Sequence, residues 1–459
     1  MTRQRILVIG GVAAGPAAAA EAHRTDPEAD IVLYEQGRTV SYAACELPYL
    51  VSGRVSDPGS LVRHTPAQLE TTRGFHVEIL QRLEAIDPSS SRIRVKDLAS
   101  ESVREERYDR LILATGARAS DGGVRDLHGP GVSNLRTLED GIRLAEAMTA
   151  VPGIHVAVLG GGLVGLEVAS ELAASGKRVT VLDPAGPAAA HLEPELVQVL
   201  DEALLRAGIA VRRERATAIR RMPGSAPVVV MTDRGELVGA RQVVSALGLE
   251  PATQIGAAAG LKLGVSGAYR VDETLRTSVR GIWACGDCVE VPRLPDGKNV
   301  FAPLAPTAFR TARVAGHNAA RRGRSAEHKL PRQAVAYAAS IAGLEIASVG
   351  MTLRAASAAG FDALHVSVKH TSASSLHANS TRLHAVLVFD RSSGLLLGGQ
   401  FVGRSGAAAR ANVVVAALHA GASVRDLHEF DFIYAPPLAP SLDILTIAAG
   451  AAQKALGRR

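Results

Sequence analysis

Cysteine, aromatic residues and long apolar runs are all scarce in this sequence of 459 residues. Three cysteines, Cys45, Cys285 and Cys288, are too few for the disulfide framework of a secreted protein, and their number is odd. No apolar stretch reaches the roughly 18 residues that a membrane-spanning helix needs. We therefore expect a cytoplasmic protein without a membrane partner. Aromatic residues make up only 3% of the chain, but the hydrophobic fraction of 47% is ample for buried cores.

A sustained run of one charge sign is also missing, although the formal net charge is +6. Arginine and glutamate alternate throughout the chain, so a nucleic-acid-binding surface is not predicted. A mildly positive surface that attracts anionic cofactors explains the charge. The length exceeds that of one ordinary hydrophobic core, which indicates two or three domains.

The first 35 residues have the pattern of a dinucleotide-binding unit, with a strand, a glycine turn, a helix and a second strand. Gly10, Gly11 and Gly15 lie in the turn, and Val12 takes the place of the middle glycine of the G-x-G-x-x-G fingerprint. We expect Gly11 to let the backbone approach a pyrophosphate at the helix N-terminus. Glu35 follows Gly15 by about 20 residues, where a carboxylate accepts hydrogen bonds from a ribose.

A second copy of this pattern is complete, with Gly160, Gly162 and Gly165 followed by Asp183. Two dinucleotide sites imply two cofactors, and the usual reason is electron transfer from a nicotinamide to a flavin. The residues after Asp183, at 184–186, contain no arginine to meet a 2′-phosphate, and the acid itself would repel one. NADH is therefore favoured over NADPH, which stays possible.

Further markers follow at predicted strand ends. YDRLILATGA ends in Thr115 and Gly116, and VVSALGLEP repeats that form around Gly248. We expect both to pass beside a bound nucleotide. Asp287 lies in ACGDC, a position suited to binding the polyol chain of a flavin.

Cys45 begins a predicted short helix in SYAACELPYLVSG. The helix dipole favours the thiolate there and predicts a reactive cysteine, whereas the neighbouring Glu46 opposes ionisation. The alternative is a small buried hydrophobic side chain. Cys285 and Cys288 enclose the predicted flavin motif, so we interpret them as packing residues rather than a second redox pair, and no metal site is predicted.

In their order, these motifs resemble the coenzyme A disulfide reductase branch of the pyridine nucleotide-disulfide oxidoreductases, which also contains NADH oxidases and peroxidases. The resemblance extends over essentially the whole chain. The matching segments are GGVAAG at 10–15, Cys45 with LPY at 47–49, ATGA at 114–117, GGGLVGLE at 160–167, CGDCVEV at 285–291 and IYAPPLAP at 433–440. It implies an α/β fold with two Rossmann-like domains, for FAD and NAD, and a C-terminal α+β dimerisation domain in a homodimer.

The resemblance also implies an active site in which Cys45 lies over the flavin. Tyr434 of the partner subunit would approach this cysteine and protonate a departing thiolate, unless it is an ordinary packed aromatic. Glu167 would lie near the junction of flavin and nicotinamide, or be a simple acid on a helix face. The place of a second tyrosine of the family falls at His377 or Leu376. His377 would be a substitute proton donor, or only a loop histidine.

Several departures from the family pattern fall where substrate should bind. Ala44 and Glu46 flank Cys45, where the family usually has asparagine and a small residue. Glu21 and His23 stand where the family tends to carry glutamine and arginine for the coenzyme A nucleotide, with Arg24 retained. These changes count against coenzyme A disulfide as the substrate. They leave the flavin and nicotinamide prediction untouched.

We expect an FAD domain at 1–113 and 251–325, an NAD(P)H domain at 114–250 and a dimerisation domain at 330–459, joined by a polar linker at 321–332. The predicted strands of the last domain are 334–338, 344–349, 363–369, 382–389 and 395–402, and the predicted helices are 352–359 and 406–420.

Three functions are compatible with the sequence. The first is reduction of a small-molecule disulfide, persulfide or related sulfur substrate through Cys45. The second is an NADH oxidase or peroxidase in which Cys45 cycles through a sulfenic acid. The third is an electron-transfer reductase for a partner protein, in which Cys45 plays no part.

Overall fold

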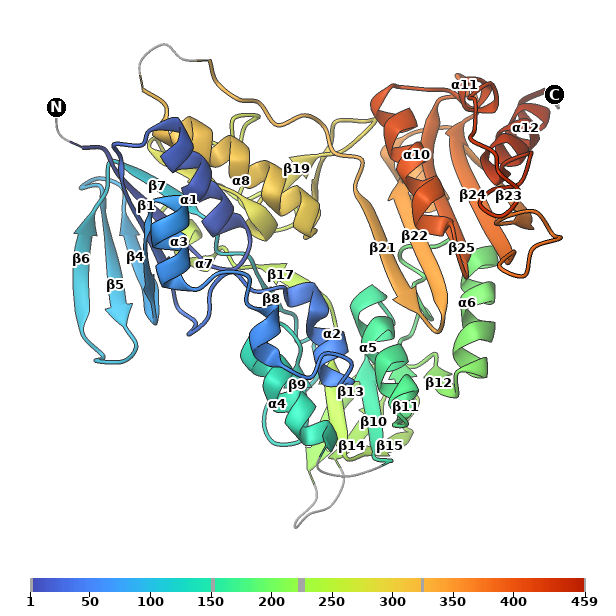
Figure 1. Cartoon of the computed structure of the whole chain (residues 1–459). Coiled ribbons are helices and arrows are strands. Elements are labelled where there is room, and N and C mark those ends of the chain that lie inside the picture. The colour runs from blue at the N-terminus through green and yellow to red at the C-terminus, as the bar shows by residue number, and fades with distance from the viewer. Residues whose placement is uncertain (1–2, 150–152, 222–227, 323–325, 458–459) are drawn as a thin grey trace.

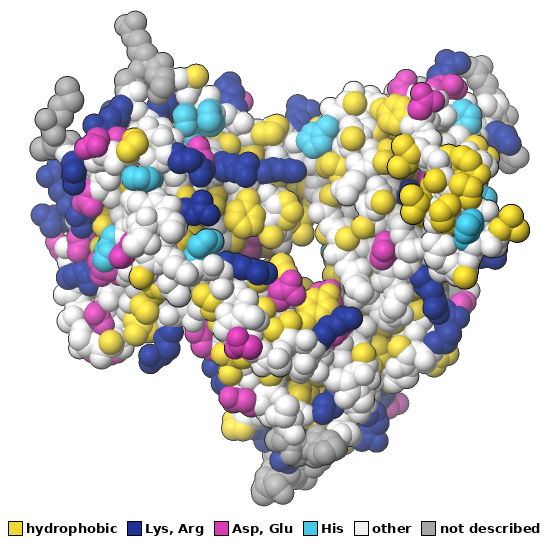
Figure 2. Space-filling model, in the orientation of Figure 1, with side chains coloured by type: hydrophobic (Ala, Val, Ile, Leu, Met, Phe, Trp, Pro, Cys, Tyr) yellow, Lys and Arg dark blue, Asp and Glu magenta, His cyan; other side chains and the backbone are white. Residues whose placement is uncertain are grey.

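The chain folds into three parts around a central hollow, which Figure 2 shows as an opening in the surface. The computed structural model describes residues 3–149, 153–221, 228–322 and 326–457. Residues 323–325 of the predicted linker lie outside this range. The predicted α/β fold is confirmed, with two parallel sheets in the first two parts and an antiparallel sheet in the third (Figure 1).

The first part is built on a parallel sheet in the order β18-β7-β1-β2-β3. Its strands are β1 (Arg5–Ile9), β2 (Asp30–Glu35), β3 (His76–Ile79), β7 (Arg110–Leu113) and β18 (Ile282–Ala284). Helix α1 (Ala14–Thr25) packs against α8 (Ala305–Ala320) so closely that a Cβ on Gly316 would lie 2.2 Å from the carbonyl oxygen of Ala18. Small side chains on both helices permit this contact.

Smaller elements surround that sheet. They are α3 (Pro66–Arg73), α7 (Gln254–Ala258), the antiparallel strands β4 (Gln81–Asp87), β5 (Arg92–Asp97) and β6 (Val103–Arg107), and the pair β19 (Glu290–Pro292) and β20 (Asn299–Phe301). A second pair, β8 (Ala117–Ala119) and β17 (Leu249–Pro251), carries the chain out to the second part and back.

The second part repeats the architecture of the first, with a parallel sheet in the order β12-β11-β10-β16-β9. Its strands are β9 (Val132–Asn134), β10 (His155–Leu159), β11 (Arg178–Leu182), β12 (Ile209–Arg212) and β16 (Gln242–Ser245). The helices are α4 (Leu138–Thr149), α5 (Leu163–Ala174) and α6 (Pro194–Arg206), and a small sheet joins β13 (Ala216–Arg221), β14 (Val228–Thr232) and β15 (Leu237–Ala240).

The third part is an antiparallel sheet in the order β21-β22-β25-β24-β23. Its strands are β21 (Ala336–Ile341), β22 (Leu344–Gly350), β23 (Ala363–Thr371), β24 (Arg382–Asp390) and β25 (Leu396–Gly403), and its helices are α9 (Leu353–Ala359), α10 (Ala407–His419), α11 (Val424–His428) and α12 (Ile444–Gly457). Buried Glu193 fixes this part to the second one, because its N–H donates to Gln400 Oε1 at 2.6 Å and its carboxylate accepts from Leu353 N at 2.7 Å.

Within the described residues, no helix combines the length and apolar character that crossing a bilayer requires.

Candidate functional site

The first glycine turn joins β1 to α1 with no room for side chains at two positions. A Cβ on Gly10, whose φ is +108°, would lie 2.2 Å from the carbonyl oxygen of Ala114, and one on Gly15 would lie 1.7 Å from that of Gly10. No side chain caps α1, which begins after Ala13. The first N–H groups of the helix are therefore left for an anionic ligand.

The second turn, between β10 and α5, repeats this geometry. A Cβ on Gly160 would lie 2.3 Å from the carbonyl oxygen of Ala246, and one on Gly165 would lie 2.1 Å from that of Gly160. Gly162 caps α5 without a side chain, and no atom lies within 4 Å of the place where its Cβ would stand. An open glycine at this point leaves room for the close approach of a pyrophosphate.

The acid of each unit stands beside its own glycine turn. Glu35 accepts hydrogen bonds from the N–H groups of Gly11 and Gly37, both at 2.6 Å, and Asp183 accepts one from Gly161 at 2.7 Å. Burial raises the pKa of Glu35, and the two N–H bonds oppose this rise. A dinucleotide needs N–H donors for its pyrophosphate and a carboxylate for its ribose. Both turns offer these groups, so their residues fit such a cofactor.

The structure explains why glycine is needed at position 11, for a reason that the sequence did not indicate. A Cβ there would lie 2.8 Å from both Glu35 Cβ and Val40 Cγ1. Gly11 therefore lets the acid and the segment after β2 pack against the turn.

The strand ends marked by Thr115, Gly116 and Gly248 meet where the first two parts join. Thr115 Oγ1 donates to the carbonyl oxygen of Ala252 at 2.7 Å, and the N–H of Ala252 donates to that of Gly116 at 3.0 Å. Gly116 and Gly248 both have positive φ, +70° and +100°. The two segments thus form a paired crossover beside the first glycine turn.

Asp287 lies in a single 3₁₀ turn against the start of α1. A Cβ on Gly286 would lie 2.7 Å from that of Ala14, which places Asp287 next to the first glycine turn, as a flavin-binding role requires. Cys285 and Cys288 are free thiols and are fully buried, and Cys288 Sγ donates to the carbonyl oxygen of Cys285 at 3.1 Å. Burial raises the pKa of both thiols, so these cysteines have the surroundings of packing residues.

Cys45 lies in a 3₁₀ turn, Ala44–Glu46, directly before α2 (Leu47–Val51), and its side chain is exposed. This excludes the alternative of a buried hydrophobic cysteine. The charges of Glu167, Asp287 and Arg136 all influence the pKa of this thiol, so three segments that are distant in the sequence lie within electrostatic reach of it.

The expected lowering of the thiol pKa by the helix dipole is wrong for the chain by itself. Desolvation by the surrounding protein raises the pKa of Cys45 most, followed by the negative charges of Glu167 and Asp287, while Arg136 lowers it. Glu46 also raises this pKa, as predicted, by a smaller effect. The five-residue helix α2 is too short to outweigh these charges.

Glu167 connects the second glycine unit to the cysteine segment. Its Oε1 accepts a hydrogen bond from the hydroxyl of Tyr49 at 2.9 Å, and one helical turn further on Glu171 accepts bonds from Ser52 and Arg54, both at 3.0 Å. Burial raises the pKa of Glu167, and the bond from Tyr49 opposes this rise. Helices α2 and α5 are therefore held together by polar contacts next to Cys45.

Arg136 is the residue of this site that sequence reasoning missed. It follows the short strand β9, and its Nη2 lies 3.1 Å from Asp287 Oδ2 while its Nε donates to the carbonyl oxygen of Ala117. It is the positive charge that lowers the pKa of Cys45. No sequence motif marks Arg136. The nearby Asp140 indicates only that a helix begins here.

Tyr434 and His377 lie far from the Cys45 of the same chain. Tyr434 is exposed between α11 and α12, which stand apart from α2 in Figure 1, and His377 lies in the loop between β23 and β24. These two loops contact each other, because Ser374 N donates to the carbonyl oxygen of Pro436 at 3.0 Å and Asn379 Nδ2 to that of Pro437 at 2.8 Å.

Large hydrophobic side chains are exposed on the same two loops. They are Leu376, Ile433, Tyr434, Leu438 and Leu442. Figure 2 shows a gathering of hydrophobic side chains over the third part of the chain. A patch of this kind is typical of a protein contact surface.

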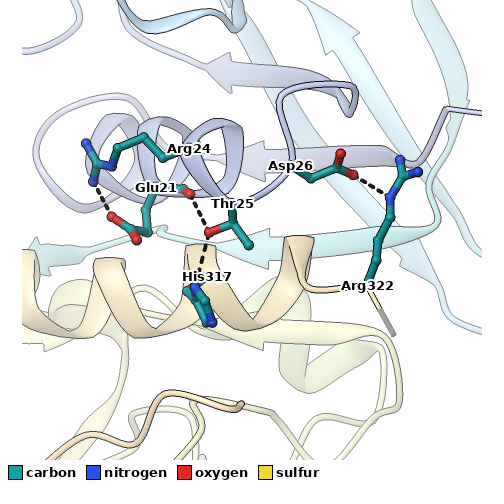
Figure 3. Close-up of a pocket in the computed structure, with 6 residues that line it drawn as sticks. All are labelled: Glu21, Arg24, Thr25, Asp26, His317 and Arg322. Atoms are coloured by element: carbon teal, nitrogen blue, oxygen red, sulfur yellow. Dashed lines mark hydrogen bonds and ion pairs between the residues drawn. The ribbon is translucent and has the colours of Figure 1, made fainter. Parts of the chain in front are cut away.

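A polar cavity of about 500 Å³ opens between α1 and α8 (Figure 3). It is lined by Glu21, Arg24, Thr25, Asp26, His317 and Arg322. Arg24 forms an ion pair with Glu21, and Arg322 Nε lies 2.6 Å from Asp26 Oδ2. Each cation at this cavity therefore faces an acid. His23 lies elsewhere, against Gly74.

Two dinucleotide folds with a thiol held between them define an oxidoreductase that works with two nucleotide cofactors. The model of the pyridine nucleotide-disulphide oxidoreductase family matches residues 4–321, and that of its dimerisation domain matches residues 338–444. The chain belongs to this family, which confirms the resemblance seen in the sequence. The family is FAD-dependent and uses NAD(P)H, so the predicted cofactors are confirmed as well.

The chain is similar to proteins named as reductases of sulfur compounds and to one named as an NADH oxidase. It is 29% identical to the NAD(P)H coenzyme A polysulfide/persulfide reductase of Pyrococcus horikoshii, over 97% of this chain and 98% of that protein. It is 28% identical to the NADH oxidase of Methanocaldococcus jannaschii, over 99% of this chain and all of that protein. The solved NAD-dependent persulfide reductase from A. fulgidus is 30% identical, with a TM-score of 0.93 over 98% of this chain and 83% of that one.

Proposed function

We propose that this enzyme reduces a small disulfide or persulfide through Cys45, with electrons that pass from NAD(P)H through FAD. The observation that carries the proposal is the set of neighbours around this exposed thiol. Glu167, from the helix of the second glycine turn, binds Tyr49 of the cysteine segment at 2.9 Å. The charges of Glu167 and of Asp287, from the predicted flavin turn, both raise the pKa of Cys45, although more than 100 residues separate each from it in sequence.

The proposed reaction consumes one nicotinamide and one proton for each substrate disulfide. The Cys45 thiolate attacks one sulfur of the substrate, so that a Cys45 mixed disulfide forms and one thiol leaves with a proton. Bound FAD, once reduced by NAD(P)H, would supply the two electrons that reduce this mixed disulfide. The second thiol is then released, and the Cys45 thiolate is restored.

The residues around Cys45 have distinct proposed roles. Arg136 stabilises the thiolate by its charge and holds Asp287 at 3.1 Å, in position for the flavin. Glu167 and Tyr49, joined at 2.9 Å, keep the cysteine segment on α5, the helix that begins at the nicotinamide turn. Glu35 and Asp183 serve the two riboses.

The proposed active unit is a homodimer that covers the hydrophobic patch on the third part. Tyr434 of one subunit would then reach the Cys45 of the other and protonate the departing thiolate, with His377 in the adjoining loop as a further donor. The match to a dimerisation domain and the exposed Leu376, Ile433 and Leu438 support this arrangement.

The charges at the cavity between α1 and α8 support a substrate other than coenzyme A disulfide. In the family, the first helix serves the coenzyme A nucleotide, which is strongly anionic. Here Glu21 and Asp26 neutralise Arg24 and Arg322, so the cavity offers little net positive charge to phosphate groups. We propose a smaller or less anionic sulfur compound.

An anaerobic titration with NADH tests the role of Cys45 against both alternatives. We expect a long-wavelength charge-transfer band in the unaltered enzyme and none in Cys45→Ser, which should also lose disulfide turnover at least about 100-fold. Reduction of a one-electron acceptor should survive the substitution, since the flavin is intact. Disulfide turnover that survives in Cys45→Ser would favour the electron-transfer alternative and overturn the proposal.

A substrate panel separates the reductase function from the NADH oxidase function. The similarity to the NADH oxidase of Methanocaldococcus jannaschii supports the second alternative. Consumption of NADH is measured with oxygen, with peroxide and with small disulfides and persulfides. Faster turnover with a sulfur substrate supports the proposal. Turnover with oxygen or peroxide alone contradicts it.

A further inference from the structure

An arginine stands over the turn that follows Asp183, although none is present in that turn itself. Arg213 comes directly after β12, and a Cβ on Gly186 would lie only 2.1 Å from its Nη1. The same nitrogen donates to the carbonyl oxygen of Ala185 at 3.1 Å. A guanidinium from 30 residues further along the chain is thus held against the residues that follow the ribose-binding acid.

The position matters because NAD and NADP differ only in the 2′-phosphate of the ribose next to Asp183. In dinucleotide-binding folds, an acid at the end of the second strand selects the free 2′-hydroxyl, and a nearby arginine accommodates the phosphate. Here both are present. Asp183 accepts hydrogen bonds from the N–H groups of Ala185 and Gly186, at 2.8 and 3.2 Å, so the acid and Arg213 lie on the same turn.

Asp201 of α6 restrains this arginine. Its Oδ2 lies 2.6 Å from Arg213 Nη2, and the two side chains are 34% and 49% exposed. An ion pair with this much exposure contributes little free energy because water and salt screen it. A 2′-phosphate carries about two negative charges and can bind a guanidinium bidentately, whereas Asp201 contacts Arg213 through Oδ2, so the phosphate is the stronger partner.

The surroundings leave room for a phosphate. A cavity of about 580 Å³ is lined by Ala185, Asp201 and Arg213 on the second part, and by Arg354 of α9 on the third part. Arg354 is exposed and adds a second positive charge to this cavity. The negative charges of Asp183 beside the ribose and of Asp201 and Glu193 at the cavity oppose a phosphate, and the cations Arg213 and Arg354 favour one.

We infer that Arg213 is a specificity residue that binds the 2′-phosphate of NADP(H), and that Asp201 limits this binding by competing for the same guanidinium. The inference rests on the proposed assignment of the second glycine turn to the nicotinamide cofactor. The enzyme then binds both NADH and NADPH. Because Asp201 competes for Arg213, NADPH binds less tightly than it would without Asp201. Residues 184–186 contain no arginine, so the preference for NADH expected from them is weakened by Arg213.

Binding of the oxidised cofactors to the FAD-loaded enzyme tests this without turnover. Dissociation constants of NAD⁺ and NADP⁺ are measured by calorimetry. Arg213→Ala is expected to weaken NADP⁺ about tenfold and to leave NAD⁺ unchanged, since a charge-assisted hydrogen bond to phosphate is worth about that factor. Arg213→Lys should keep part of the affinity, and Asp201→Asn should tighten NADP⁺ several-fold by releasing the arginine.

Arg206→Ala is the matched control. Arg206 lies on the same helix as Asp201 and pairs with Glu202 at 4.0 Å, away from the cavity, so neither affinity should change. Equal effects of Arg213→Ala on both cofactors, or no effect on NADP⁺, would overturn the inference. Unaltered enzyme that binds NAD⁺ but no NADP⁺ would overturn it too. Binding of neither cofactor would refute the assignment of the second turn as well.

Discussion

The two glycine turns have nearly the same backbone and very different surroundings. Gly10 and Gly160 have φ values of +108° and +105°, and in both turns the last glycine fits directly against the carbonyl oxygen of the first. Glu35, the acid of the first unit, is only 9% exposed, whereas Asp183 of the second is half-buried. The acid of the first turn is therefore the more enclosed of the two, as expected if that turn holds the retained flavin and the second turn the exchanging nicotinamide, which is the assignment proposed above.

The helices that follow the two turns also differ in their surroundings. Glu167 on α5 contacts Tyr49, and the matching position on α1, two residues after the last glycine, is Ala17. α1 instead packs closely against α8 through small residues. The second unit makes polar contacts to the cysteine segment and to the third part, whereas α1 packs against α8 mainly through small side chains.

The largest effect is expected from adding a methyl group to either turn. Gly15→Ala should produce protein without bound flavin and lower the free energy of unfolding by about 3 kcal/mol or more, because the Cβ would overlap a backbone oxygen at 1.7 Å. Gly165→Ala should keep flavin in the folded fraction and lose NAD⁺ affinity. Flavin content is measured by absorbance, NAD⁺ affinity by calorimetry and stability by thermal melting.

Gly239→Ala is the control for this pair. Gly239 is exposed on β15, and no atom lies within 4 Å of the place where its Cβ would stand, so neither cofactor nor stability should respond. Full flavin content in Gly15→Ala would contradict the assignment of flavin to the first turn. Loss of flavin in Gly165→Ala but not in Gly15→Ala would mean that the two turns serve the opposite cofactors.

A smaller effect is expected at Glu167, where the second unit touches the thiol. The negative charge of Glu167 raises the pKa of Cys45, so Glu167→Gln should lower that pKa and make the thiolate appear at lower pH. The glutamine still accepts the bond from Tyr49. The pH dependence of Cys45 alkylation by iodoacetamide in the reduced enzyme measures the shift.

Glu46→Gln calibrates this measurement, because Glu46 raises the same pKa by a smaller effect. Its profile should move in the same direction and less far. Arg136→Gln should move the profile to higher pH, since Arg136 lowers the pKa of Cys45. A profile that stays fixed in Glu167→Gln would show that α5 does not act on the thiol.

Local patterns explain why much of the fold was predictable. All five strands of the third sheet and helices α9 and α10 were predicted to within three residues, because alternating apolar residues and glycine breaks define them locally. Helix α12 (Ile444–Gly457) was missed, since its alanine-rich sequence has little contrast between faces. The three-stranded sheet β4-β5-β6 was missed too, because charged residues fill its strands.

The site was predictable only where a motif marks it. Cys45, Glu167 and Asp287 each belong to a recognisable segment, and the fold brings them together. Arg136 and Arg213 lie just after short strands, and the roles proposed for them depend on which turns lie opposite them in space. Such pairings between distant segments leave no local signature.

The smallest effect is expected from a single hydrogen bond that only the second unit has. Ser170 of α5 accepts a bond from the N–H of Ala342 at 2.8 Å in the turn after β21, and the matching residue of α1 is Ala20. Ser170→Ala should cost about 1 kcal/mol of unfolding free energy, because the N–H loses its partner at the junction with the third part. Ser175→Ala, at the end of the same helix, should change stability by less than about 0.5 kcal/mol in denaturant titrations. Equal losses in both variants would mean that the bond at the junction with the third part stabilises the fold no more than the bond at the end of the helix.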